Sequence, residues 1–194
     1  MKFLFFNKLN SRYARLENFQ NLIYQLSTLL RTSMDDEKTT LQLITSSVTS
    51  LLNVKRSIIF LYDKTENLLL AKEMSGLDIS EFSDNIKIRP GEGIIGKKVF
   101  MEKKSMLIKD AFADNLTIKR IIEKLDIKSF LAVPLLDNDK AIGVLYADTK
   151  LDGSGFVEDD LKLLSIFASF ASISIKNAQL IKSLRSEVKV IKNI

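Results

Sequence analysis

The chain has 194 residues, of which 46% are apolar and 27% are charged, and its formal net charge is +5. This length suits one well-buried domain of about 150 residues with helical extensions, and the composition excludes a largely disordered chain. No apolar run reaches the roughly 18 to 20 residues of a membrane helix, and the N-terminal MKFLFFNKLNSR lacks a signal-peptide core and cleavage site. We therefore predict a cytoplasmic protein with no membrane partner.

Cysteine and histidine are both absent from the sequence. Their absence excludes disulfides, a thiolate nucleophile, an imidazole base and any zinc or iron site built from these residues. The lysines and arginines are scattered and form no block, which argues against direct nucleic-acid binding. We predict a chain that is not an enzyme and has no metal site.

Two helices are predicted at the start of the chain. Residues 8–31 carry apolar side chains at heptad spacing, typical of a helix that pairs with a partner helix. The seam consists of Leu9, Leu16, Phe19, Ile23, Leu26 and Leu30. The cap-type and acidic residues of TSMDDEKT then precede a second helix over about 36–53, whose apolar residues recur every three or four positions.

Short strands follow from residue 56 onward. RSIIFLYD and NLLLAKEM read as a hairpin, and NIKIR at 85–89 reads as a third short strand. Pro90 and its neighbouring glycines break the chain before a short helix around 94–99. The strand SMLIKD is then followed by a helix over 115–126 with one apolar face.

The last third of the sequence predicts a hairpin and one long helix. KSFLAVPLL and AIGVLYADT flank the tight polar turn DNDK, and we expect this hairpin at the centre of the sheet. From Glu158 a helix runs to the end of the chain, its acidic first turn complementing the positive end of its dipole. A second coiled-coil seam consists of Ile181, Leu184, Val188 and Ile191.

Four patterns could carry chemistry, and each has a simpler structural interpretation. GEGIIG at 91–96 fits the dinucleotide-binding template, but it lacks the βαβ setting and is interpreted as a turn. Glu158, Asp159 and Asp160 point in different directions on a helix, so capping is favoured over cation binding. The aspartates of DNDK are explained by turn chemistry. The aromatic side chains suit core packing, although Phe112, Phe130 and Tyr146 could line a pocket.

Five segments, in order and correctly separated, resemble the GAF family of small-molecule sensors. They are Pro90–Gly96 (P-G-x-G-[IL]-x-G), Leu107–Asp110, Ser129–Leu135, Ile142–Leu145, and Phe156–Leu164 with the helix through Asn177 and Ala178. The resemblance covers roughly 35–180. Val157 departs from the pattern, because the family usually has a Ser or Thr there that caps the last helix.

The resemblance implies an α+β fold, related to PAS domains, with a central and mainly antiparallel sheet flanked by helices. It divides the chain into an N-terminal dimerisation helix (1–34), a GAF domain (35–180) and the start of a C-terminal coiled-coil linker (181–194) to a downstream effector domain. The ligand pocket would lie beneath the segment from about 76 to 128. The residues expected to face a ligand are Asp110, Phe112, Asp114, Asn115, Arg120, Ser129 and Phe130.

The same resemblance restricts the ligand. Without Cys or His, the chain cannot be a bilin-binding, haem-binding or iron-based nitric-oxide-sensing member, nor a cysteine-dependent free methionine sulfoxide reductase. A noncovalent cyclic nucleotide, nucleotide or small carboxylate remains. We predict a homodimer, formed through the terminal helices, that transmits ligand state to a transcription activator, histidine kinase or cyclase. The alternative is a dimerisation module with no ligand.

Overall fold

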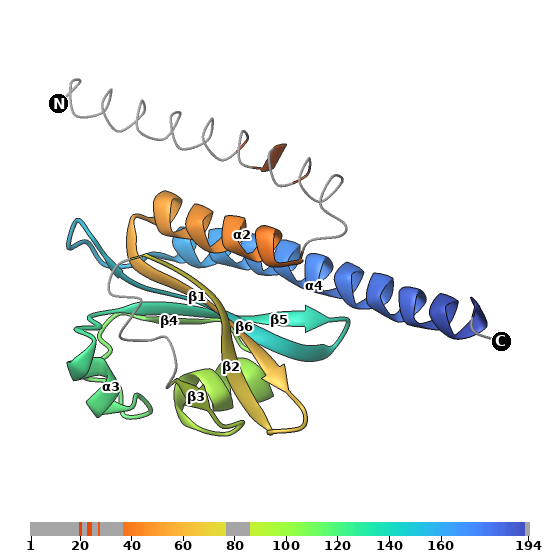
Figure 1. Cartoon of the computed structure of the whole chain (residues 1–194). Helices are drawn as coiled ribbons and strands as arrows, with labels where there is room; N and C mark the ends of the chain where they lie inside the picture. Colours follow the sequence, from red (N-terminus) through yellow and green to blue (C-terminus); the bar gives the residue numbers. More distant parts are fainter. Residues whose placement is uncertain (1–19, 21–22, 25–26, 28–36, 77–85, 193–194) are drawn as a thin grey trace.

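The computed structural model describes residues 20, 23–24, 27, 37–76 and 86–192, with side chains to residue 185 (Figure 1). The N-terminal helix predicted over 8–31 lies mostly outside this part of the chain, although the four described residues within it are helical. Its seam residues Leu9, Leu16, Phe19, Leu26 and Leu30 fall outside the described residues. So do the side chains of Val188 and Ile191 in the C-terminal seam.

Two helices pack side by side on one face of the sheet (Figure 1). Helix α2 spans Glu37–Leu52 and buries Leu41, Ile44 and Val48, which confirms the helix predicted over 36–53. Helix α4 spans Glu158–Lys192 and begins at the predicted residue. By length and composition, Glu158–Arg185 of α4 could cross a membrane. In this fold, one face of α4 packs against α2 and the sheet.

Six strands form one sheet in the described part of the chain, in the order β3-β2-β1-β6-β5-β4. Every pair of neighbouring strands is antiparallel, as the sequence predicts. The strands span Val54–Asp63 (β1), Leu68–Gly76 (β2), Lys87–Ile88 (β3), Met106–Ile108 (β4), Phe130–Asp137 (β5) and Lys140–Lys150 (β6). Each predicted strand is present, with ends that move by a few residues.

The β5–β6 hairpin turns at Asn138 and Asp139, where Asn138 takes a φ of 53°. Asparagine tolerates this left-handed conformation, so the polar turn DNDK folds as expected. The hairpin is central only in part. Strand β6 lies in the middle of the sheet because β1 pairs along its other edge, whereas β5 lies one position further out, beside the edge strand β4.

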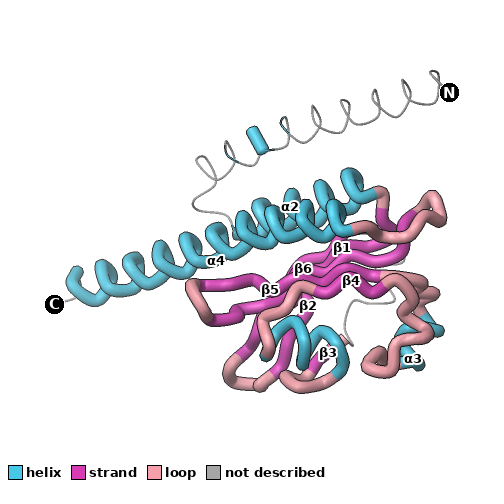
Figure 2. Tube along the Cα trace, turned by 180° about the vertical axis from the view of Figure 1, so that it is seen from behind, coloured by secondary structure: helices cyan, strands magenta, loops and turns pink. Residues whose placement is uncertain are grey.

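The opposite face of the sheet is covered by two short helices (Figure 2). Helix η2 spans Gly93–Met101 and has π-helical winding, where the sequence predicts a short helix. Helix α3 spans only Lys119–Lys124, although the apolar pattern predicts 115–126. The carboxylates of Asp110 and Asp114 accept backbone N–H bonds at 2.8–3.0 Å from residues two or three positions ahead, which holds 110–116 in turns instead of helix.

The sheet thus separates two apolar cores. Side chains of successive strand residues point to opposite faces, so neighbours in sequence enter different cores. Leu131 and Leu145 face the α2–α4 side, while Phe130 and Tyr146 face the side of η2 and α3. A substitution in one core is therefore adjacent in sequence to residues that belong to the other core.

A buried ion pair fixes the start of α4. Lys150 at the end of β6 contacts the Asp160 carboxylate at 2.8 Å, and both side chains are almost fully buried. Asp160 also accepts the backbone N–H of Val157 at 2.9 Å. This bond is the half of a capping box that a residue in the first turn supplies, so the cap survives in part although Val157 has no hydroxyl.

Candidate functional site

A pocket lies between the sheet and the two helices η2 and α3. Its volume is about 580 Å³, counting the open solvent at its mouth. The lining residues are Ile58, Phe60, Ile86, Ile88, Glu92, Gly93, Ile94, Ile95, Leu116, Thr117, Ile118, Ile121, Ile122, Ile127, Phe130 and Tyr146. Almost all of these side chains are apolar, so the pocket is a partly open extension of the apolar core on the side of η2 and α3.

Three aromatic rings from the central strands form part of the pocket wall. Phe60 of β1 meets Tyr146 of β6 edge to face, with ring centroids 6.4 Å apart. Phe130 of β5 lies 5.4 Å from Tyr146 in a tilted arrangement. Each contact joins residues on neighbouring strands, so sheet register sets the ring positions. Such pairs contribute packing energy beyond their buried area.

The opposite walls come from the two short helices and the turn before η2. Gly93, Ile94 and Ile95 line the pocket from η2, and Ile121 and Ile122 line it from α3. These isoleucines are stiff about χ1, because their side chains branch at Cβ. The pocket is therefore bounded by aromatic rings on one side and branched aliphatic side chains on the other.

The glycines of GEGIIG allow backbone conformations and a close backbone approach that other residues would not, which agrees with the interpretation of this motif as a structural turn. Gly91 and Gly93 have φ angles of 87° and 57°, which glycine adopts without strain. A Cβ atom on Gly96 would lie 2.2 Å from the carbonyl oxygen of Arg89. Gly96 therefore lets η2 pack directly on the chain that enters it.

The polar side chains of the lining are already engaged with the protein. The Thr117 hydroxyl donates to the carbonyl oxygens of Ala111 at 2.7 Å and Asp114 at 2.8 Å. The Glu92 carboxylate accepts the N–H of Arg89 at 3.1 Å. Burial, and after it the negative charge of Asp148, raises the pKa of Tyr146 well above its usual value, so this phenol stays protonated at neutral pH.

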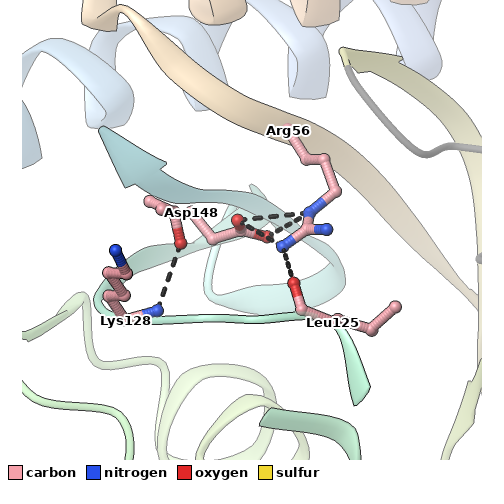
Figure 3. A network of polar contacts seen from close by, with 5 residues as sticks. Arg56, Leu125, Lys128 and Asp148 are labelled. Atoms are coloured by element: carbon pink, nitrogen blue, oxygen red, sulfur yellow. Dashed lines mark hydrogen bonds and ion pairs between the residues drawn. The ribbon is translucent and has the colours of Figure 1, made fainter. Parts of the chain in front are cut away.

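A buried charge network lies on the same face of the sheet (Figure 3). The Arg56 guanidinium donates to both carboxylate oxygens of Asp148, from Nη2 at 2.8 Å and from Nε at 3.0 Å. The same Nη2 donates to the carbonyl oxygen of Leu125 at 2.8 Å. Arg56 is 1% exposed and Asp148 is fully buried. The network therefore ties the end of α3 to the two central strands.

Sequence reasoning missed this network. Its signal in the sequence is weak, because β1 and β6 each contain other charged residues near their ends. Only the register of β1 on β6 places Arg56 opposite Asp148. Burial raises the pKa of the Asp148 carboxyl, although the guanidinium of Arg56 opposes this shift. Arg56 and Asp148 do not line the pocket, so we assign them a structural role.

The predicted ligand-facing residues are distributed over several places. Phe130 lines the apolar pocket, and Ser129 is buried next to it on the chain. Asp110 and Phe112 line a second hollow with Lys109, Ile122, Glu123, Asp126, Ile127 and Lys128. Asp114, Asn115 and Arg120 line neither hollow, and the Asp114 carboxylate accepts the N–H of Leu116. Tyr146, considered with Phe112 and Phe130 as a possible pocket residue, lines the apolar pocket.

No group of three or more acidic side chains that could hold a metal ion occurs among the described residues. The predicted acidic cluster at the start of α4 is divided, because its members face different ways. Asp160 points inward to Lys150, whereas Asp159 contacts Lys162 at the surface. The arrangement matches the predicted helix-start role and leaves the apolar pocket as the candidate site.

Comparison with known proteins identifies the family. Residues 36–175 match the GAF domain. The chain is 34% identical over 113 residues to a dual 3',5'-cyclic-AMP and -GMP phosphodiesterase 11A of Takifugu rubripes. This alignment covers 54% of the chain and 12% of the phosphodiesterase, so the chain spans about an eighth of that relative's length.

Two solved structures show the same fold. The GAF domain of a phosphoenolpyruvate-protein phosphotransferase from Coxiella burnetii has a TM-score of 0.73 at 18% identity, and the match covers 86% of this chain and 98% of that one. A free methionine-R-sulfoxide reductase from Neisseria meningitidis has a TM-score of 0.70 at 18% identity, with coverage of 84% and 91%. Because the family match extends over well more than half of the residues, the chain belongs to the GAF domain family of regulatory sensor domains.

Proposed function

We propose that this GAF domain senses a small molecule held noncovalently in the apolar pocket and transmits its presence through the sheet to helices α2 and α4. The observation that carries the proposal is the position of the pocket relative to those helices. Phe130 and Tyr146 line the pocket, while their sequence neighbours Leu131 and Leu145 pack in the core beneath α2 and α4. A ligand that shifts these strands would change the surface on which both helices rest.

Direct polar contacts join α4 to the strand that carries Phe130. The hydroxyl of Ser172 accepts the N–H of Leu136 at 3.0 Å, at the irregularity in β5 where the ladder is interrupted. Lys176 forms an ion pair with Asp137 at the end of the same strand. These contacts give β5 a mechanical connection to α4, as a transmission route through packed and hydrogen-bonded groups requires.

The outward face of α4 supports dimerisation as the output of this domain. Ile166, Ile173 and Leu180 are exposed at intervals of seven residues, and Leu184 of the predicted seam is 60% exposed. Heptad spacing of apolar residues on one helix face is the pattern of a helix that pairs with another. We propose a homodimer that uses this face together with the N-terminal helix, and a coiled coil that continues through Ile181 and Leu184.

The effector remains a transcription activator, a histidine kinase or a cyclase in this proposal. We assign no catalytic activity to the domain itself. The phosphodiesterase relative supports a place for the domain in a longer signalling protein, because the matching segment is a small part of that enzyme. In such an arrangement, the ligand favours one of two helix geometries. The size of this shift is set by how much more tightly the ligand binds one geometry than the other.

A ligand screen with a structural readout tests the proposal. Cyclic nucleotides, nucleotides, 2-oxo acids and neutral aromatic compounds would be compared by thermal shift, and hits by amide hydrogen exchange of α4. A ligand at 100 times its dissociation constant should add about 2.7 kcal/mol to the free energy of unfolding. A hit should also change exchange in α4, on the far side of the sheet. If no compound of any class stabilises the protein, the alternative of a dimerisation module without a ligand is favoured.

A further inference from the structure

We infer that the pocket takes an uncharged and predominantly apolar small molecule, such as an aromatic or branched hydrocarbon, and not a cyclic nucleotide, nucleotide or carboxylate. This inference rests on the proposed sensor function, because it names the class of ligand for the same pocket. Its basis is the chemistry of the described residues that line the pocket, most of which are apolar.

The described lining residues offer mainly apolar contact surface and few polar groups. Nine of the sixteen described lining residues are isoleucine, and Leu116, Phe60 and Phe130 add further apolar area. Small-molecule sites are usually largely apolar but include a few convergent polar groups that orient the ligand. Here the hydroxyl of Thr117 already donates to backbone carbonyls of the same loop. Shape and dispersion contacts must therefore provide most of the recognition.

The charge of the lining opposes anions. Among the described residues that line the pocket there is no lysine or arginine, and the one ionisable carboxyl is that of Glu92. A phosphate or carboxylate placed among the isoleucines would lose its hydration without gaining a cationic side chain among the described lining residues, and Glu92 would repel it. Cyclic nucleotides, nucleotides, 2-oxo acids and fatty-acid carboxylates all carry such a group.

The buried charges nearby do not change this conclusion. The Arg56 guanidinium is committed to Asp148 and to the carbonyl oxygen of Leu125, and neither Arg56 nor Asp148 reaches the lining. Tyr146 is the phenol on the pocket wall, and burial keeps it neutral. A purine base has several donors and acceptors along its edges, and leaving these unpaired in an apolar site costs binding free energy.

The experiment compares two ligands that differ by one charge. Binding of indole and of indole-3-carboxylate to the whole chain would be measured by calorimetry and thermal shift, with p-xylene as a second neutral probe and cGMP and cAMP as charged probes. We expect indole and p-xylene to raise Tm in a dose-dependent way. Indole should bind at least about tenfold more tightly than its carboxylate, because the charged form must be desolvated without a partner.

Substitutions locate the binding. Ile121→Phe replaces a branched aliphatic side chain on α3 with a bulkier aromatic ring that fills part of the pocket. It should weaken indole binding at least about tenfold. Ile95→Phe does the same from η2 and replaces the first variant if that one does not fold. Leu151→Phe is the matched control, because Leu151 is exposed in the loop before α4, outside the lining, and indole binding should stay unchanged.

The outcomes separate this inference from the proposed function. If cGMP, cAMP or the carboxylate stabilises the protein while indole and p-xylene do not, the ligand class is wrong and the sensor proposal stands. If neither the probes nor any compound of the wider screen stabilises the protein, both the ligand class and the proposed sensor function are wrong. If indole stabilises both filled-pocket variants as strongly as the wild type, the neutral probes bind elsewhere and the inference is overturned.

Discussion

The buried Arg56–Asp148 pair makes the sharpest stability prediction for this fold. In Asp148→Asn the side chain keeps its shape, but the guanidinium loses the negative charge that compensates it inside the protein. Its donors at 2.8 and 3.0 Å then face an amide that can accept at one oxygen only. Removing one partner of a buried pair typically costs about 3–5 kcal/mol.

Replacing both charges should be less harmful than replacing one. Arg56→Met with Asp148→Leu removes the desolvation penalty of both ions, and such exchanges are often neutral or stabilising. The carbonyl oxygen of Leu125 would still lose its donor, at a cost of about 1–3 kcal/mol. We therefore expect the double variant to be more stable than Asp148→Asn alone.

Urea unfolding measures both variants against the wild type. With a slope of about 2 kcal/mol per molar urea, a loss of 4 kcal/mol lowers the midpoint by about 2 M, while the slope stays constant. The reasoning would be refuted by a loss below about 1 kcal/mol in Asp148→Asn, or by a double variant as unstable as the single one. Either result would mean that the protein does not depend on charge compensation at this site.

Three further predictions test other parts of the fold. Asp160→Ala should lower the free energy of unfolding by about 3 kcal/mol, because Lys150 is left buried without its partner, while the exposed Asp159→Ala should have little effect in the same urea assay. Gly96→Ala should cost about 1–3 kcal/mol through its contact with the Arg89 carbonyl, whereas Gly155→Ala, which meets open space, should not. The proposed homodimer predicts that Ile173→Glu shifts the protein from dimer to monomer in sedimentation velocity at micromolar concentration. The exposed loop variant Leu151→Glu should remain a dimer, and a dimer in both would place the interface elsewhere.

The elements were accessible from the sequence because they depend on local chemistry. Apolar spacing of three and four residues predicts α2, and β-rich runs around a polar turn predict the β5–β6 hairpin. The start of α4 follows from its acidic first turn. Helix α3 starts later than its apolar face predicts, since the Asp114 carboxylate accepts the N–H of Leu116 inside the predicted range and holds that stretch in a turn.

The candidate site was less accessible because a pocket is a property of packing. Phe130 and Tyr146 were expected either to fill the core or to line a pocket, and the sequence alone does not separate these roles. Nine isoleucines reach one cavity from β1, β3, η2, α3 and the segments beside them, and their sequence spacing carries no sign of that convergence. The pairing of Arg56 with Asp148 across 92 positions likewise depends on strand register.

Two classes of information are therefore distinct in this protein. The sequence by itself determined the family, the antiparallel α+β architecture and the absence of any cysteine or histidine chemistry, because these follow from local patterns and from residue types. Only the tertiary structure decided that the pocket is apolar, that its few polar groups are already engaged, and that α3 is held by a buried arginine. These features arise where residues far apart in the chain meet, and their energies depend on burial that local sequence does not record.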